Sequence, residues 1–270
     1  MPNWSYNEIA IRGTKQEVIN FLNDGLKQTH GRKKSFSLLA DNATSVEIED
    51  KLRNYGLSLR SWLPMPRTFI KWDTTNRLQN FDWWLDEKIL KHKVEWKAIQ
   101  ENIEAYKEQY GAEYAKYCKG YEKAKKYQQR VHGHVGWYDY NCATLGTKWN
   151  SEFEGWELVM DNDDDFVVIG HCDTAWSMPE AWLQRMRSKY PLLHFYMYAW
   201  EESYAYIGYF DGENPDDWTE KYDYKQAANE VAEKHPDLDN ESEEYYNVVS
   251  DILNEHMAEI HEHFMEYICK

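Results

Sequence analysis

Residues 146–212 contain the most regular succession of strand-like and helix-like segments in the chain, and this succession constrains the fold most strongly. Two apolar runs, 156–160 and 166–169, are typical of strands, and the acidic turn 161–165 separates them. The two runs therefore predict a β-hairpin. The turn lacks the alternating ligand spacing and the closing glutamate of a calcium-binding loop, so we expect it to bind no metal.

A helix and two more strands are predicted to follow the hairpin. The helix covers 180–189 and ends at Tyr190-Pro191, because the residue before a proline disfavours helical conformation. Ser177 is the expected N-cap, since serine is among the preferred residues at that position. The strands are predicted over 192–200 and 204–210.

The N-terminal segment predicts a strand followed by a capped helix. Residues 7–12 alternate, and Gly13 ends the run. Thr14 and Glu17 have the spacing of a capping box, in which each side chain satisfies a free N–H of the first helical turn. The apolar face of this helix is formed by Val18, Phe21, Leu22 and Leu26. Further along, we expect a short strand at 36–39, a helix at 45–55 and an extended segment at 63–66.

Two long helical segments carry apolar stripes. Between residues 73 and 130 the chain has no proline, and its apolar residues recur at steps of three and four. This pattern predicts one helix, or two helices broken near Gly111, and a loop at 132–137. The stripe either packs inside the protein or forms an exposed contact surface. It contains Trp96, Ile99, Ile103, Tyr106, Tyr110, Tyr114, Tyr117, Tyr121 and Ala124.

The C-terminal region predicts a helix at 224–234, ended by Pro236, and a last helix at 242–267. The last helix has an apolar stripe that covers a sheet or forms a dimer seam. We therefore expect a homo-oligomer, with candidate interface residues on both stripes: Tyr106, Tyr110, Tyr114, Tyr117, Tyr121, Val249, Leu253, Met257, Ile260 and Phe264.

Together these segments predict an α+β fold, a ferredoxin-like antiparallel sheet with a helical, tyrosine-rich insertion and C-terminal helices. Residues 1–72 supply the first strand-helix-strand part of the sheet, and 73–136 form the helical insertion. Residues 137–212 form the ferredoxin-like portion, and 213–270 form acidic C-terminal helices.

Charge is distributed unevenly along the chain. The net charge is −16, and residues 131–270 carry 8 Lys/Arg against 30 Asp/Glu, a net charge of −22. General binding to nucleic acid or to an anionic membrane is therefore disfavoured, because both need a basic face. A local basic patch within residues 1–130 is compatible with their net charge of +6.

The remaining composition indicates a protein of the reducing cytoplasm. The four cysteines are far apart and form no Cys-x-x-Cys pair, so neither a disulfide framework nor a zinc site is expected. The N-terminus has no secretory signal pattern, and no apolar run is long enough to span a membrane. We expect cytoplasmic localisation.

No catalytic or metal-binding constellation is predicted. His256 and His261 are five residues apart, which does not place two ligands on one helical face, and His132 and His134 have no third ligand nearby. Cys172 follows His171 on a strand, so their side chains point to opposite faces. We expect no catalytic residue, no metal and no cofactor.

One polar and aromatic set is a candidate ligand site. If the loops after Gly146 and Thr174 meet at one end of the sheet, their indole faces and polar groups form a pocket suited to a base or a nucleotide-like ligand. The alternative is that Trp149 and Trp176 fill the core while Lys148 and Asn150 hold the loops. The set is Trp4, Lys148, Trp149, Asn150, Thr174, Trp176 and Ser177.

Three ordered sequence blocks resemble an uncharacterised family carried by phages and plasmids, the family of the plasmid protein YubB. They are Pro2-Asn3-Trp4 with Asn7 and Gly13, then Trp137-Tyr138 with 146–150, and then 174–179 with Tyr190-Pro191 and a strand to Gly208-Tyr209. Met178 stands where the family is expected to have proline. The resemblance implies a mobile-element context and a ferredoxin-like domain, and it implies no catalytic residues.

These features favour a non-enzymatic phage or mobile-element protein that binds and inhibits a host bacterial component, such as a defence protein. Its acidic half would mimic nucleic acid to a basic partner. One alternative is a sponge or receptor for a nucleotide-like molecule. A metal-dependent hydrolase or nuclease with an unrecognised site is a third hypothesis.

Overall fold

The computed structural model describes residues 3–31, 33, 36–72, 80–201, 207–211 and 218–269. The chain divides into two compact units. Residues 1–64 and 144–270 form the sheet unit, and residues 65–143 form the helical unit. The predicted helical insertion, 73–136, falls within the second of these.

The sheet unit is built around an antiparallel sheet, so the fold belongs to the α+β class. Among the described residues the strands follow the order β2-β3-β4-β1-β5-β6-β7. β1 is central and pairs with β4 on one side and β5 on the other. The strands are β1 (Trp4–Gly13), β2 (Leu57–Ser58), β3 (Glu152–Asn162), β4 (Asp165–Ala175), β5 (His194–Glu201), β6 (Ile207–Asp211) and β7 (Trp218–Tyr222).

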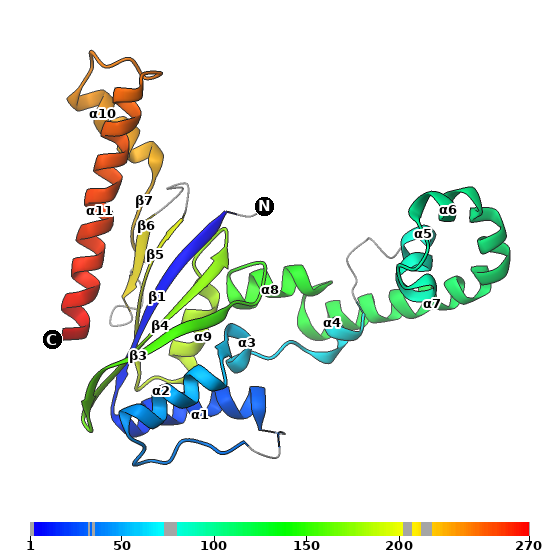
Figure 1. Cartoon of the computed structure of the whole chain (residues 1–270), viewed down its shortest axis with the longest axis horizontal. Helices are drawn as coiled ribbons and strands as arrows, with labels where there is room; N and C mark the ends of the chain where they lie inside the picture. The colour runs from blue at the N-terminus through cyan, green and yellow to red at the C-terminus, as the bar shows by residue number, and fades with distance from the viewer. Residues whose placement is uncertain are drawn as a thin grey trace. The chain divides into compact units, whose positions relative to one another are not determined.

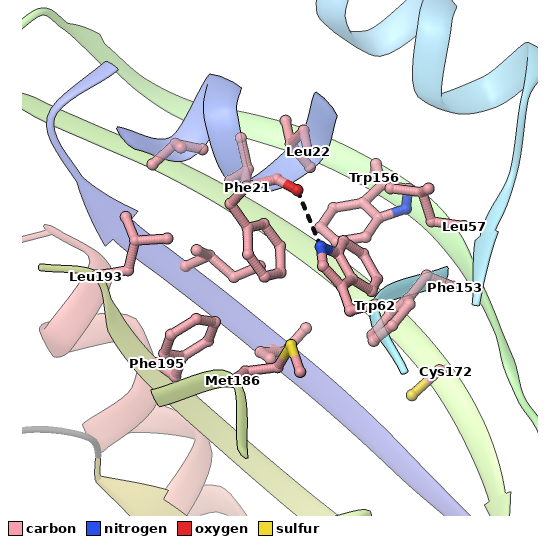
Figure 2. Packing of buried hydrophobic residues seen from close by; sticks show 14 of the residues in the cluster. Phe21, Leu22, Leu57, Trp62, Phe153, Trp156, Cys172, Met186, Leu193 and Phe195 are labelled. Atoms are coloured by element: carbon pink, nitrogen blue, oxygen red, sulfur yellow. Dashed lines mark hydrogen bonds between the residues drawn. The ribbon is translucent and has the colours of Figure 1, made fainter. Parts of the chain in front are cut away.

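One face of the sheet is covered by α1 (Lys15–His30), α2 (Ser45–Asn54), α3 (Leu59–Trp62) and α9 (Glu180–Lys189), which enclose the main core (Figure 1). Thr14 and Glu17 form the predicted capping box of α1. Figure 2 shows the core, where the Trp62 indole N–H donates to the Phe21 carbonyl at 2.9 Å. Each fully buried Phe or Leu side chain contributes roughly 1.5–3 kcal/mol to folding.

The opposite face is covered by α11 (Glu243–Cys269), with α10 (Tyr224–Lys234) packed beside it (Figure 1). Phe264 is fully buried against Tyr196, at 5.5 Å between ring centroids. Val249, Leu253 and Ile260 are buried with residues of α10 and β6, and Met257 is partly buried there. The apolar stripe of α11 therefore covers the chain's own sheet and is not exposed for a dimer seam.

The helical unit contains α4 (Arg67–Lys71), α5 (Phe81–Trp84), a π-helical segment η2 (Leu85–Leu90), α6 (Trp96–Glu101) and α7 (Ile103–His132), and α8 (Trp137–Leu145) begins in it. The tyrosine stripe of α7 lies against Trp84, Leu85 and Ile99 within this unit. Tyr121 is buried, and Tyr106, Tyr110, Tyr114 and Tyr117 are partly buried. The stripe is therefore packing surface.

Several local expectations were wrong. The predicted strand at 36–39 is irregular backbone. The loop predicted at 132–137 is present at residues 133–136, but the segment after it, which was not predicted to be helical, is helix α8. The chain does not break at Gly111, because α7 runs through it, and the helical break lies at Asn102. Ser177 does not cap α9, whose N-cap is Pro179. The beginning of the strand predicted at 204–210 lies outside the described residues.

No helix in the described part of the chain is both long enough and apolar enough to cross a bilayer.

Candidate functional site: an acidic aromatic groove on the sheet

The sheet register brings two carboxylates and an imidazole together on one face. Glu154 is paired with His171, and directly paired residues point to the same side of a sheet. Asp173 lies two residues beyond His171, so it shares that face. This is the face that α11 covers further along, but here Glu154 and Asp173 are exposed.

Two tryptophans form an aromatic wall beside these groups. Trp4 begins β1, pairs with Ala175 at the end of β4, and is 37% exposed. The ring centroids of Trp4 and Trp149 are 6.1 Å apart, with an interplanar angle of 42°. The groove between these elements has a volume of about 260 Å³. Its lining consists of Trp4, Trp149, Asn150, Ser151, Glu152, Glu154, His171, Cys172 and Asp173.

The electrostatics of this groove, which we call the acidic groove, favour a cation. Partial burial and the neighbouring Glu154 carboxylate raise the pKa of Asp173, while His171 opposes this shift. A bound cation would relieve the repulsion between the carboxylates. Lys148 shows that the adjacent ring attracts an ammonium group, because its Nζ lies 4.7 Å from the Trp149 ring centroid.

A second aromatic pair continues the surface along the same face. Tyr6 is paired with Trp200 across β1 and β5, and their rings stack at 4.3 Å. Glu8 follows on β1 and lies 3.9 Å from the His171 imidazole. The Glu8 carboxylate also raises the pKa of the half-buried Tyr198, although burial is the larger cause.

The structure brings together only part of the predicted ligand set. Trp4, Trp149 and Asn150 line the groove, and the Asn150 side chain accepts from the backbone N–H of Arg60 at 2.9 Å. Trp176 is 54% exposed but is not part of the lining. Its backbone is in the left-handed region, with φ of 72°, and its backbone N–H donates to the Asn3 carbonyl.

Two other predicted members, Thr174 and Ser177, hold the loops in place. Thr174 is fully buried, accepts from the Asn7 amide at 2.9 Å and donates to the Ser177 carbonyl at 2.6 Å. The Ser177 hydroxyl donates to the Gly146 carbonyl at 2.9 Å. Neither residue belongs to the groove lining.

The carboxylates and the histidine of the groove were not predicted from the sequence. Glu152, Glu154, His171 and Asp173 belong to two strands, and only the pairing of those strands brings them together. One signal was present. His171 and Asp173 alternate with buried neighbours, and polar residues alternating within an apolar strand indicate a face open to solvent or ligand.

The cysteine and histidines considered as catalytic or metal-binding candidates in the sequence pack against other side chains of the protein. Cys172 is buried, and burial raises the pKa of its thiol. His132 lies in ring contact with Phe69 and Tyr140, and the His256 ring lies 3.8 Å from that of Tyr222. Within the part of the chain that the structure describes, no three His, Cys, Asp or Glu side chains are placed to hold a metal ion.

Comparison with known proteins adds little. No family model matches the chain, and no curated protein matches it. A crystal structure of the protein api92 from Yersinia pseudotuberculosis, of the family named DUF1281, is similar to this chain with a TM-score of 0.34 and 12% sequence identity. The similarity covers 83% of this chain and 98% of that one. At that score it carries no argument about fold or function.

Proposed function

We propose that this chain is a non-enzymatic binding protein that captures a lysine or arginine side chain of a basic partner protein in the acidic groove. The observation that carries the proposal is the placement of Trp4 and Trp149 beside three exposed carboxylates, those of Glu152, Glu154 and Asp173. Indole faces attract cations, and the carboxylates supply the ionic partners. The same carboxylates repel phosphate, so this groove does not favour the predicted nucleotide-like ligand.

The exposed surface of α11 favours the proposal that the partner is a protein with an extended basic surface. Its 27 residues include seven Asp or Glu and no Lys or Arg. Five of the carboxylates recur at steps of three and four, which corresponds to roughly 4.5–6 Å along the helix axis. They are Asp251, Glu255, Glu259, Glu262 and Glu266, all of them exposed. Such a row resembles a line of phosphates to a basic protein.

The proposed context is a phage or related mobile element, where the chain would engage and inhibit a host component such as a defence protein. The sequence blocks that resemble the YubB family support this context. The ferredoxin-like topology is part of the same proposal. Its support is the order β3-β4-β1-β5, with α1 and α9 as the two connecting helices on one face.

Binding of a labelled arginine-rich peptide, followed by fluorescence anisotropy at low and high salt, tests the recognition chemistry. We expect affinity to fall steeply with salt, because exposed charges carry the attraction. Trp149→Ala should weaken binding about tenfold, the size of one cation–π contact. Trp176→Ala is the matched control, since it removes a more exposed indole outside the groove lining.

A pull-down from bacterial lysate with the same variants tests the partner. We expect a basic host protein that the wild type and Trp176→Ala retain at low salt and that Trp149→Ala loses. A partner retained equally by Trp149→Ala, or a peptide affinity that does not depend on salt, would contradict the proposal.

A further inference from the structure

A second groove lies entirely within the helical unit and has the opposite charge. It has a volume of about 700 Å³ and opens between η2 and the middle of α7. Its lining is mainly apolar and aromatic, and its rim is lysine-rich. We call it the basic groove. The lining residues are Trp72, Trp84, Lys88, Ile89, Glu113, Lys116, Tyr117, Lys119, Gly120 and Lys123.

The aromatic lining depends on a glycine in the middle of a helix. A Cβ at Gly120 would lie 2.4 Å from the Trp72 ring, so only glycine lets that ring lie directly on α7. Trp72 is 5.7 Å from Tyr117 between ring centroids, and Tyr117 is 6.0 Å from Trp84. Trp72 and Tyr117 are only partly buried, so part of each ring faces the groove.

The lysines are available for a ligand. Lys88, Lys116, Lys119 and Lys123 are all exposed, and no carboxylate of a described residue lies within salt-bridge distance of them. Glu113 is the one acidic residue among the described lining. Residues 114–132 carry six Lys or Arg against one Glu, in a chain whose net charge is −16. The charge of this segment therefore has the opposite sign to the net charge of the protein.

We propose that the basic groove binds single-stranded nucleic acid. Bases would stack on the exposed parts of Trp72 and Tyr117, and phosphates would pair with the lysines, the two interactions by which proteins hold a single strand without reading its sequence. The net charge of −16 disfavours such binding over the protein surface in general.

The linear arrangement of the positive charge favours a strand over a free nucleotide. Lys116, Lys119 and Lys123 lie on one side of α7, at steps of roughly 4.5 and 6 Å along the axis. The positive run continues to Arg130, roughly 21 Å from Lys116 along the same helix. One nucleotide cannot reach over that length, whereas several successive phosphates can. A duplex fits poorly, because its base faces are already stacked on each other.

Anisotropy of a short labelled oligo(dT), titrated with the full chain over a series of salt concentrations, tests the proposal. Lys119→Glu with Lys123→Glu should lower affinity at least tenfold. It should also reduce the slope of log affinity against log salt by about 1.4, since each neutralised phosphate of a single strand contributes about 0.7. Trp72→Ala should lower affinity about tenfold through lost stacking.

Lys27→Glu with Lys225→Glu is the matched control, because it makes the same charge change at exposed lysines of the sheet unit. We expect it to leave affinity within about twofold. Because the substituted lysine side chains are exposed, these variants should keep the helical circular dichroism spectrum of the wild type. An unchanged spectrum distinguishes a loss of binding from a loss of folding. Absence of saturable binding at low salt, an equal loss in the control, or equal affinity for thymidine monophosphate or for duplex DNA would each overturn the proposal.

Discussion

The two grooves use the same kind of side chain and differ in the charge around it. In the acidic groove, Trp4 and Trp149 stand beside Glu152, Glu154 and Asp173. In the basic groove, aromatic rings are surrounded by four exposed lysines and a single glutamate of the described lining. An aromatic face accepts either a cation or a stacked base, so the neighbouring charges decide which of the two it binds.

The grooves also differ in how the chain builds them. The acidic groove depends on strand pairing between residues far apart in sequence, such as Trp4 and Ala175. Most residues of the basic groove belong to one helix, α7, and its lysines recur at helical spacing. The first should therefore respond to changes in the sheet, and the second to changes in α7.

The largest expected effect is on the floor of the basic groove. Gly120→Ala places a Cβ against the Trp72 ring, and overpacking of this kind costs about 2 kcal/mol. Gly111→Ala is the matched control, because its Cβ meets open space, and it should stabilise α7 by about 1 kcal/mol. Thermal unfolding of the two variants measures both. If both glycines behaved alike, the Trp72 contact would not be the reason for Gly120.

A smaller effect is expected in the sheet unit. Arg12 binds the Asp165 carboxylate through two contacts of 2.6 and 2.7 Å and donates to the Tyr267 carbonyl of α11 at 2.8 Å. Arg12→Leu should lower the free energy of unfolding by about 1.5 kcal/mol at neutral pH. Urea unfolding measures this loss, and oligonucleotide binding to the basic groove should not change.

The sign of the pH dependence at this pair follows from Asp165. Hydrogen bonds from Arg12 lower its pKa in the folded state, so the carboxylate stabilises the fold above the unfolded pKa. That contribution disappears as the pH falls through the lowered folded pKa. The difference between wild type and Arg12→Leu should therefore shrink in acid. A difference that stayed constant would assign the loss to the Tyr267 contact instead.

The smallest expected effect is on ligand binding by the acidic groove. Because the pKa of Asp173 is raised, this carboxylate takes up a proton earlier than an ordinary aspartate as the pH falls. Affinity for an arginine-rich peptide should then fall a few-fold, about 1 kcal/mol, as the pH drops through that pKa. Asp173→Asn should give weaker binding and a flatter profile between pH 7 and about pH 4. A profile unchanged by Asp173→Asn would place the titrating group elsewhere.

Local signals predicted much of the fold. The Thr14 capping box, the helices at 45–55, 180–189 and 224–234 and the hairpin around residues 161–165 depend on neighbouring residues, and the structure contains each of them. Gly111 misled the prediction of a helix break, because a glycine costs only about 1 kcal/mol in a helix that tertiary packing supports.

The site was less predictable for a physical reason. Trp4 and Trp149 could be chosen as exposed aromatic candidates, but their acidic neighbours are assembled by the register of β3 on β4. The register shifts between Glu154 and Glu157, and the spacing of apolar residues in the sequence does not predict this shift. Thr174 and Ser177 looked like ligand groups because their hydrogen bonds to nearby loops cannot be read from sequence.

The most direct test of two independent grooves measures the binding of both ligands to the same three proteins. Wild type, Trp149→Ala and Lys119→Glu with Lys123→Glu are titrated with the arginine-rich peptide and with oligo(dT). We expect a crossed pattern, in which Trp149→Ala loses about tenfold in affinity for the peptide alone and the lysine variant loses at least tenfold in affinity for the oligonucleotide alone. Loss of both ligands in either variant, or no loss in both, would contradict two independent grooves of opposite charge.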